Sequence, residues 1–285
     1  MLNFLLIDEL IKNALAEDIG TGDITTNTTI DENILIQGIF IAKESGIICG
    51  LDVCRRVFFL VDENIKFTLN NNISDGKEIK KGDIIATVSG NARSILNAER
   101  VSLNLLQHMS GIATQTYDSV KQVSHTKAKI ADTRKTTPCM RVLEKYAVKI
   151  GGGVNHRFNL ADGILIKDNH IAANGGSING GIKKAVESAR KNAPHTLKIE
   201  VECENIDEVR QALEAGADII MLDNMTNDEM KKAVEFISGR AITEASGNMG
   251  EKNLTEVAET GVDIISIGAL THSVKNLDIS LKLKI

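Results

Sequence analysis

The sequence predicts an α/β protein in which a β-rich N-terminal part precedes a parallel sheet with alternating helices. Three observations predict this class. Short apolar runs alternate with helical patterns through the C-terminal part of the chain. The later units repeat at close to 21 residues, and each apolar run is followed by a polar or charged residue. Because functional groups follow many strands rather than a single switch point, a barrel is favoured over an open doubly wound sheet.

The bulk composition limits both location and partners. The 285 residues suffice for one large domain or two modest ones. A net charge of −5 and an aromatic content of 3% argue against a nucleic-acid binder. No apolar run approaches the roughly 18 residues of a membrane span. The cysteines form no C-x-x-C pair, which favours a reducing compartment. We therefore expect a cytoplasmic protein without nucleic-acid or membrane partners.

The N-terminal part predicts one helix followed by short strands. Leucine and isoleucine recur at helical spacing over residues 2–14, and Asp8 and Glu9 interrupt what would otherwise resemble a signal peptide. Residues 75–88 resemble half of a biotinyl or lipoyl carrier domain, but Lys43 lacks the usual Met-Lys-Met setting. We expect a small β-rich domain instead. The predicted strands are 37–42, 46–50, 65–69 and 83–88.

The C-terminal part predicts a long helix and then six strand–helix units. The helical pattern runs over 94–116 and continues to about residue 123. An oxygen-bearing N-cap with Glu three residues later marks three helix starts, and Gly216 and Gly261 suit left-handed C-caps. The three starts are Asn205, Thr226 and Asn253. The strand units begin at Lys129, Gly163, Lys198, Asp218, Ala241 and Asp263.

Charge divides the predicted barrel mouth into two sides. Residues 127–170 hold nine Lys and Arg against four acids, whereas residues 199–230 hold ten acids against one cation. Glu202 and Asp223 directly follow apolar strand runs. Asp223 lies 21 residues after Glu202, and Glu244 lies 21 residues after Asp223. One side would bind anions, and the other would bind hydroxyls, a metal or a developing cation.

Other interpretations of these residues remain open at this point. Lys167 ends a strand and could be the Schiff-base lysine of a barrel aldolase. A binding or scaffold protein would not need charged groups at six strand ends. His108 and His125 fit ordinary helix positions, while His272 fits a structural or a mouth-lining role equally well.

Seven segments in order along the chain form a recognisable series: EDIGTGDITT, AERVSLNLLQHMSGIATQT, DTRKTTPCMRVLEKYAVKIGGGVNHRFNLADGILIKDNHI, VECEN, MLDNM, EASGN and SIGALTHSV. In these segments the chain resembles the quinolinate phosphoribosyltransferase family, and the resemblance covers essentially its whole length. A paralogous pyrophosphorylase-like protein associated with molybdate transport is the runner-up, and the intact basic set argues against it.

The resemblance implies a fold, a reaction and an assembly. The fold would be a mixed α/β sandwich over residues 1–110, with 275–285 packed against it, and an incomplete seven-stranded parallel α/β barrel over 111–274. The reaction would join quinolinate to phosphoribosyl pyrophosphate, giving nicotinate mononucleotide, pyrophosphate and carbon dioxide in de novo NAD synthesis. Mg²⁺ would accompany the pyrophosphate. A homodimer would be the minimal unit.

The resemblance also implies which residues form the site. Arg100 would reach quinolinate in the partner subunit. Lys135, Glu202 and Asp223 would be catalytic, with both acids near the ribose and the metal, and Thr133 would bind substrate beside Lys135. The cations around quinolinate would be Arg134, His156, Arg157 and Lys167, and Lys135 would be shared with the phosphoribosyl side. Two turns would hold the 5′-phosphate: Ser246, Gly247 and Asn248, and Ile267, Gly268 and Ala269.

The sequence departs from the family pattern at two positions. Cys139 and Asn248 stand where relatives commonly have glycine. Asn tolerates left-handed backbone better than most residues, so Asn248 changes little. Cys139 follows a proline in a predicted loop near the mouth, and nothing marks it as a nucleophile.

Overall fold

The computed structural model describes residues 2–284, which divide into two compact units. The first unit comprises residues 2–117, 137–152 and 273–284, and the second comprises 118–136 and 153–272. Among residues 2–284, no helix is both long enough and apolar enough to cross a membrane.

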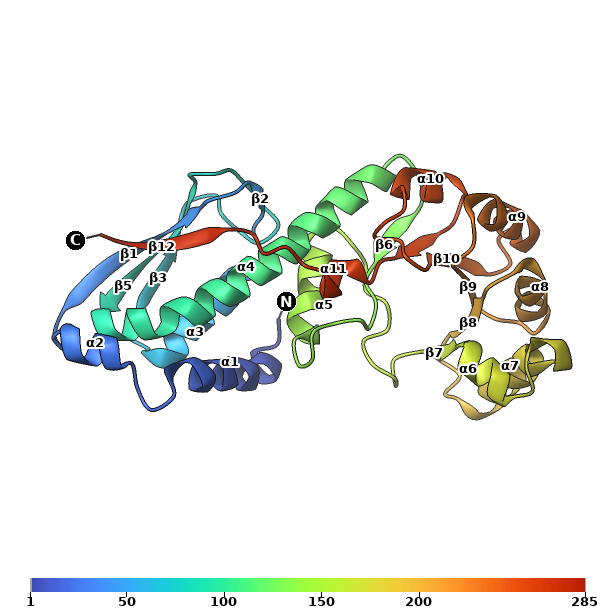
Figure 1. The fold of residues 1–285 in the computed structure, drawn as a ribbon, viewed down its shortest axis with the longest axis horizontal. Coiled ribbons are helices and arrows are strands. Elements are labelled where there is room, and N and C mark those ends of the chain that lie inside the picture. Colours follow the sequence, from blue (N-terminus) through green and yellow to red (C-terminus); the bar gives the residue numbers. More distant parts are fainter. Residues whose placement is uncertain (1, 285) are drawn as a thin grey trace. The chain divides into compact units, whose positions relative to one another are not determined.

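A four-stranded antiparallel sheet forms the centre of the first unit, with the order β12-β1-β5-β3. The C-terminal strand β12 is thus paired with β1, near the start of the chain (Figure 1). Phe40, Phe58 and Phe67 pack with ring centroids 5.6 to 6.0 Å apart and form an aromatic core. The predicted helix and the strands expected at 37–42, 65–69 and 83–88 are confirmed. The strand expected at 46–50 covers only Gly46–Ile47, and the helix Leu51–Val61 was not predicted.

The elements of the first unit are short apart from two helices, and α4 continues into the second unit. The helices are α1 (Phe4–Ile19), α2 (Ile24–Thr29), α3 (Leu51–Val61), α4 (Ala92–Val123) and α5 (Arg141–Ile150). The strands are β1 (Leu35–Ala42), β2 (Gly46–Ile47), β3 (Lys66–Leu69), β4 (Glu78–Ile79), β5 (Ile84–Asn91) and β12 (Ile279–Lys284).

The second unit is a parallel sheet flanked by helices, with the strand order β6-β11-β10-β9-β8-β7 (Figure 1). The strands are β6 (Lys129–Ala131), β7 (Ile164–Ile166), β8 (Ile199–Cys203), β9 (Ile219–Asp223), β10 (Ile242–Ser246) and β11 (Ile264–Ser266). The helices are α6 (Asp168–Ala173), η1 (Ser177–Asn179), α7 (Gly181–Asn192), α8 (Ile206–Glu214), α9 (Asn227–Ile237), α10 (Leu254–Glu259) and α11 (Ala269–His272).

This sheet has six strands where the resemblance implies seven. Beside β6, at the position of a further strand, a single parallel bridge joins Ala131 to Val154. Residues 151–153 are all glycine, and Gly152 has φ of 92°, so the segment turns sharply rather than extending into a strand. The expectation of alternating strands and helices in a parallel sheet is confirmed.

The helix-start and helix-end signals predicted from sequence are confirmed. The side chains of Asn205 and Thr226 accept hydrogen bonds from the backbone N–H three residues later, and that of Asn253 accepts one from Thr255. Gly216 and Gly261 take φ of 82° and 90°. These caps fix where each helix begins and ends, so the strand ends that follow are held in place.

Strand register gathers the polar strand residues on one face of the parallel sheet. Successive side chains of a strand point to opposite faces, so Glu200 and Glu202 share a face in β8. Met221 pairs with both Glu202 and Glu244, which places these residues on that same face. We call it the inner face. The alternate residues, such as Val201, are fully buried on the other face.

Candidate active site

An ion pair joins the two predicted sides of the site at the carboxyl ends of neighbouring strands. Lys167 follows β7, and its Nζ lies 2.8 Å from Oε2 of Glu202 in β8. The Glu202 side chain is only 10% exposed, whereas that of Lys167 is 47% exposed. Asp223 is the last residue of the next strand and pairs in register with Ser246 of β10. Residues from the expected cationic and acidic groups are therefore in direct contact.

The buried carboxylate of Asp132 fixes the basic segment that follows β6. Its Oδ1 accepts a hydrogen bond from the backbone N–H of His156, at 2.9 Å. Its Oδ2 accepts one from Asn155 Nδ2, at 2.5 Å. Asp132 is fully buried, so it ties the segment containing Arg134 to the one containing Arg157.

The Arg157 side chain is held by the protein and lies near a second guanidinium. Its Nη1 donates a hydrogen bond to the Gly163 carbonyl, at 3.0 Å. Burial lowers the pKa of Arg157, and the nearby positive charge of Arg134 lowers it further, while Glu200 opposes this effect. Two close arginines repel one another without an anion, so a dicarboxylate bound between them would relieve that repulsion.

The first expected phosphate turn depends on a glycine that no other residue could replace. Gly247 has φ of 87°, and a Cβ there would lie 2.2 Å from Asn224 Oδ1. Asn248 has φ of 53°, so the predicted tolerance of asparagine for left-handed backbone is confirmed. The turn follows β10 directly, which leaves its backbone close to the strand end.

The second turn lies against the basic segment. A Cβ at Gly268 would come within 2.9 Å of Lys135 Cδ and 3.2 Å of the His272 ring. The Thr271 hydroxyl donates to the Lys135 carbonyl, at 2.7 Å. Thr133 Oγ1 accepts from the Lys135 N–H, at 3.0 Å. Lys135 is therefore fixed at the turn formed by Ile267, Gly268 and Ala269, with its side chain exposed.

Arg100 belongs to the other unit. It lies on α4 and is exposed. The remaining expected site residues all lie in the second unit, at or just after the ends of its strands. Of the nine cations in residues 127–170, three (Arg141, Lys145 and Lys149) lie on α5 in the first unit and follow no strand.

Comparison with known proteins decides the family. The model of the quinolinate phosphoribosyl transferase C-terminal domain matches residues 112–282, and that of the N-terminal domain matches residues 23–110. The chain belongs to the quinolinate phosphoribosyltransferase family. The aldolase and scaffold interpretations are therefore set aside.

Individual relatives agree with this membership over nearly the full length. The chain is 45% identical to a probable nicotinate-nucleotide pyrophosphorylase (carboxylating) of Bacillus subtilis, covering 98% of this chain and 94% of that protein. An Arabidopsis thaliana relative is 44% identical over 96% of this chain and 82% of its own, and is named chloroplastic. The solved structure of the nicotinate-nucleotide pyrophosphorylase from Francisella tularensis is 42% identical, with a TM-score of 0.92 over 100% of this chain and 98% of that one. The cytoplasmic location stays a prediction.

Cys139, one of the two expected departures from the family pattern, lies at a position with an unusual backbone conformation. It takes φ of 65°, in the left-handed region where glycine is favoured. Its side chain is exposed. A glycine would suit this conformation, and in this chain Cys139 adopts it with an exposed side chain.

His108 was expected to be an ordinary helix residue, but its side chain contacts a buried carboxylate. Its Nε2 lies 2.9 Å from Oε1 of Glu144, which is fully buried. The other oxygen of Glu144 accepts from the Thr137 N–H, at 3.1 Å. His108 thus anchors the carboxylate that holds the start of the loop leading to α5. His125 forms an exposed pair with Glu259, at 3.4 Å, as expected of a surface position.

The prediction of site residues from sequence missed a buried layer on the inner face. Glu200 and Glu244 are 4% and 1% exposed, and His156 Nε2 lies 3.1 Å from Glu200 Oε2 and 3.6 Å from Glu244 Oε1. Burial raises the pKa of Glu244 to about 7, and the neighbouring Glu200 carboxylate adds to the shift. Two signals were present: the 21-residue spacing reaches Glu244, and Glu200 lies two residues before Glu202, the spacing that puts both side chains on one face of a strand.

This raised pKa predicts a pH dependence of stability. In the unfolded chain Glu244 ionises near 4.5, whereas in the folded chain it stays protonated up to about pH 7. The folded state therefore binds more protons between these pH values, and stability falls as pH rises through the window, by up to about 3 kcal/mol. Glu244→Gln should remove this loss. Urea unfolding at pH 5 and pH 8 should show a smaller pH effect in the variant, and identical pH effects in both proteins would contradict the assignment.

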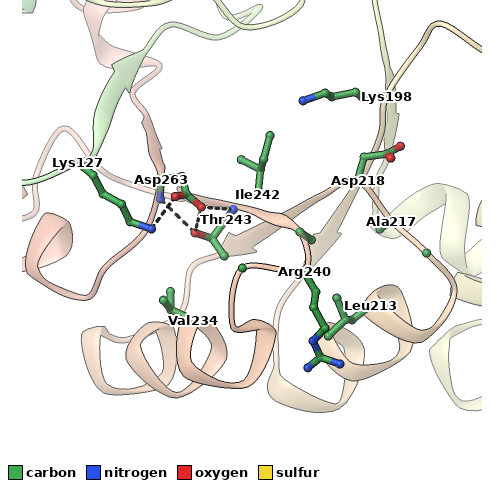
Figure 2. Close-up of a pocket in the computed structure, with 13 residues that line it drawn as sticks. Lys127, Lys198, Leu213, Ala217, Asp218, Val234, Arg240, Ile242, Thr243 and Asp263 are labelled. Carbon is green, nitrogen blue, oxygen red and sulfur yellow. Dashed lines mark hydrogen bonds and ion pairs between the residues drawn. The ribbon is translucent and has the colours of Figure 1, made fainter.

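A cavity at the other end of the parallel strands is lined by residues that stabilise the fold, and it is distinct from the candidate active site. It has a volume of about 570 Å³ and lies at the amino ends of β9, β10 and β11 (Figure 2). Two of its charged residues, Lys127 and Asp263, interact with neighbouring protein groups. Lys127 Nζ lies 2.7 Å from Asp263 Oδ1, and Asp263 Oδ2 accepts from the backbone and hydroxyl of Thr243. Ligands of parallel α/β sheets bind at the carboxyl ends, where Glu202 and Asp223 lie.

Proposed function

We propose that the residues at the carboxyl ends of the parallel strands carry out the reaction of this family, phosphoribosyl transfer to quinolinate with decarboxylation. The products are nicotinate mononucleotide, pyrophosphate and carbon dioxide. The observation that carries the assignment is the contact between Lys167 and the strand-end carboxylate of Glu202, in the same unit as the neighbouring cations Arg134 and Arg157. Incubating the purified protein with quinolinate, phosphoribosyl pyrophosphate and Mg²⁺, and measuring nicotinate mononucleotide and carbon dioxide, tests it.

The cationic residues would bind the two carboxylates of quinolinate. Arg157 is anchored through Gly163, so its guanidinium is presented without much loss of side-chain freedom on binding. Arg134 supplies the second cation and Lys167 the third. Together they would hold the pyridine nitrogen in line with C1 of the ribose, which is a positioning effect.

The acidic residues would stabilise charge on the sugar. As pyrophosphate leaves with the electrons of the C1–oxygen bond, positive charge develops on the ribose, and the pyridine nitrogen attacks there. Glu202 and Asp223 lie at the strand ends facing this position, where a carboxylate lowers the energy of a cationic transition state. When the adjacent carboxylate leaves as carbon dioxide, the electron pair of the broken bond stays on the ring carbon, where the positive charge of the quaternary nitrogen stabilises the carbanion. A proton then adds to that carbon. No covalent enzyme intermediate is needed.

The same carboxylates suit Mg²⁺. Glu202 uses Oε2 for Lys167, and Asp223 uses Oδ2 to accept from Asn224 Nδ2 at 2.7 Å. Each keeps a second oxygen, the hard donor that Mg²⁺ prefers, for direct or water-mediated contact. When bound, the ion would neutralise charge on the departing pyrophosphate. The turns at Gly247 and Gly268 would hold the 5′-phosphate through backbone N–H groups.

The assembly implied by the family is a homodimer, with Arg100 contributed to the partner's site. Its exposed position on α4, in a different unit from the remaining site residues, is compatible with this role. We also retain the division into a sandwich over 1–110 and a barrel over 111–274, in which the bridge at Val154 takes the place of the seventh strand.

Arg157→Ala should raise KM for quinolinate by roughly tenfold to a hundredfold, with KM for phosphoribosyl pyrophosphate nearly unchanged. A hydrogen bond to a charged group contributes about 1.5–3 kcal/mol, and each 1.4 kcal/mol is about tenfold in affinity. Steady-state kinetics with each substrate varied in turn measure both constants. Arg210→Ala, which removes an exposed arginine of α8, is the control. Equal losses for both substrates would contradict the proposed division of roles.

A further inference from the structure

A buried hydrogen-bonding cluster lies beneath the proposed quinolinate site. His156, Glu200 and Glu244 bring one ring nitrogen and two carboxylates within 4.8 Å of one another. Both glutamates are more than nine-tenths buried. Oε1 of each glutamate accepts no hydrogen bond from residues 2–284. Such a cluster in a sheet interior is costly to bury, so its geometry calls for an explanation.

The hydrogen bonds of His156 determine where its ring carries a proton. The backbone N–H of Arg157 points at Nδ1, at 2.7 Å. A proton on Nδ1 would bring two hydrogens together, so Nδ1 must accept with its lone pair. A neutral imidazole then carries its proton on Nε2, and this N–H donates to Glu200 Oε2 at 3.1 Å, with Glu244 Oε1 at 3.6 Å.

This arrangement restricts what His156 can do. Both ring nitrogens are engaged by the protein, and the ring is neutral, so it does not act as one more cation for a substrate carboxylate. A divalent metal held by the three side chains would need the Nε2 lone pair. That would move the proton to Nδ1 and break the bond from the Arg157 N–H. The geometry therefore favours a hydrogen-bonded support over a metal site.

We propose that Glu200 is a positioning residue for quinolinate binding, because its carboxylate accepts from Nε2–H and so holds His156 in the tautomer that fixes the backbone of Arg157. The chain of contacts runs from the Glu200 carboxylate through both nitrogens of His156 to the Arg157 N–H. Asp132 fixes the His156 N–H from the other side. The Arg157 guanidinium is held at Gly163. Arg157 is thus constrained at its backbone and at its tip. This inference rests on the proposed role of Arg157.

Two substitutions at Glu200 separate the hydrogen bond from space filling. Glu200→Gln keeps a carbonyl oxygen that can accept from Nε2–H, whereas Glu200→Leu fills similar volume without an acceptor. The leucine variant should raise KM for quinolinate by roughly tenfold to a hundredfold, since a displacement of about 1 Å can cost that much, with little change in KM for phosphoribosyl pyrophosphate. The glutamine variant should restore most of the quinolinate affinity. Glu204→Gln, at an exposed acid just beyond β8, is the matched control.

The tautomer of His156 can be measured directly. If Glu200 only filled space, its substitution would leave this tautomer unchanged. Long-range ¹H–¹⁵N spectra of histidine-labelled enzyme, with His156 assigned from a His156→Asn sample, should show a protonated Nε2 and a bare Nδ1 in the wild type and in Glu200→Gln. Glu200→Leu should lose this preference. Phosphoribosyl pyrophosphate binding by calorimetry reports whether each variant is folded. If Glu200→Leu fails this test, Glu200→Val, which also lacks an acceptor, replaces it.

Several results would contradict the proposed role of Glu200 and would leave the proposed reaction of the protein unaffected. These are unchanged quinolinate KM in Glu200→Leu, equal losses in the leucine and glutamine variants, or a protonated Nδ1 in the wild type. A divalent metal that binds tightly to the purified enzyme and is lost in Glu200→Leu would also overturn the proposal. It would show that the three side chains form a metal site rather than a hydrogen-bonded support for His156. Failure of the proposed function looks different: Arg157→Ala would then affect both substrates equally, whatever happens at Glu200.

Discussion

Glu202→Gln is expected to lower kcat by about 10²- to 10³-fold while leaving KM for quinolinate close to the wild-type value. The carboxylate is almost buried at the end of β8, where its negative charge is poorly screened by water. Removing one preorganised electrostatic contact to a developing charge typically costs a factor of this size. A loss confined to kcat identifies an interaction made chiefly in the transition state.

The ion pair between Glu202 and Lys167 explains why KM for quinolinate should stay close to the wild-type value in Glu202→Gln. Glutamine at position 202 releases the Lys167 ammonium, which lies 2.8 Å from the carboxylate in the wild type. The released cation remains available to a substrate carboxylate, so quinolinate affinity should not fall. Single-turnover measurements separate chemistry from binding, and Glu204→Gln provides a control at an exposed acid one residue beyond β8. A kcat within about threefold of the wild-type value would refute the proposed role of Glu202.

Mixing two inactive variants should restore activity if Arg100 serves the partner's site. In a heterodimer of Arg100→Ala and Lys135→Ala chains, one site receives an intact Lys135 from its own chain and an intact Arg100 from the partner. The other site lacks both. Half the sites of each heterodimer are then complete. Since random reassortment makes half of the dimers heterodimers, about a quarter of wild-type activity should return.

The experiment requires that each parent be nearly inactive and that subunits exchange. Differently tagged chains, refolded together and purified through both tags, give heterodimers alone, for which the expected activity is about half that of the wild type. Lys135→Ala mixed with Lys167→Ala is the control, because both residues lie in the same unit of one chain. If sites are shared only through Arg100, that control mixture regains nothing. Verified heterodimers of the first pair without activity would argue against a shared site.

The helices and strands of the second unit were largely predictable because their signals are local. Asn205 and Thr226 each cap a helix through a hydrogen bond to a backbone N–H three residues away. Gly216 ends one helix and Gly261 another, through a backbone conformation that glycine adopts at little cost. Such interactions need no information from distant parts of the chain. The helix α5 was harder to recognise, since Glu144 and Lys145 are buried in it and charged residues usually indicate a surface.

The sequence by itself determined the family and the set of charged residues placed at strand ends, because motifs and period-2 spacing are properties of neighbouring positions. Only the tertiary structure decided how those residues pair. That Lys167 contacts Glu202, and that Glu200 supports His156, depends on strand register and on contacts between residues 35 and 44 positions apart. In a buried sheet interior, where unpaired charge is costly, each group must find a partner. The partner is chosen by three-dimensional proximity, which the order of residues along the chain does not reveal.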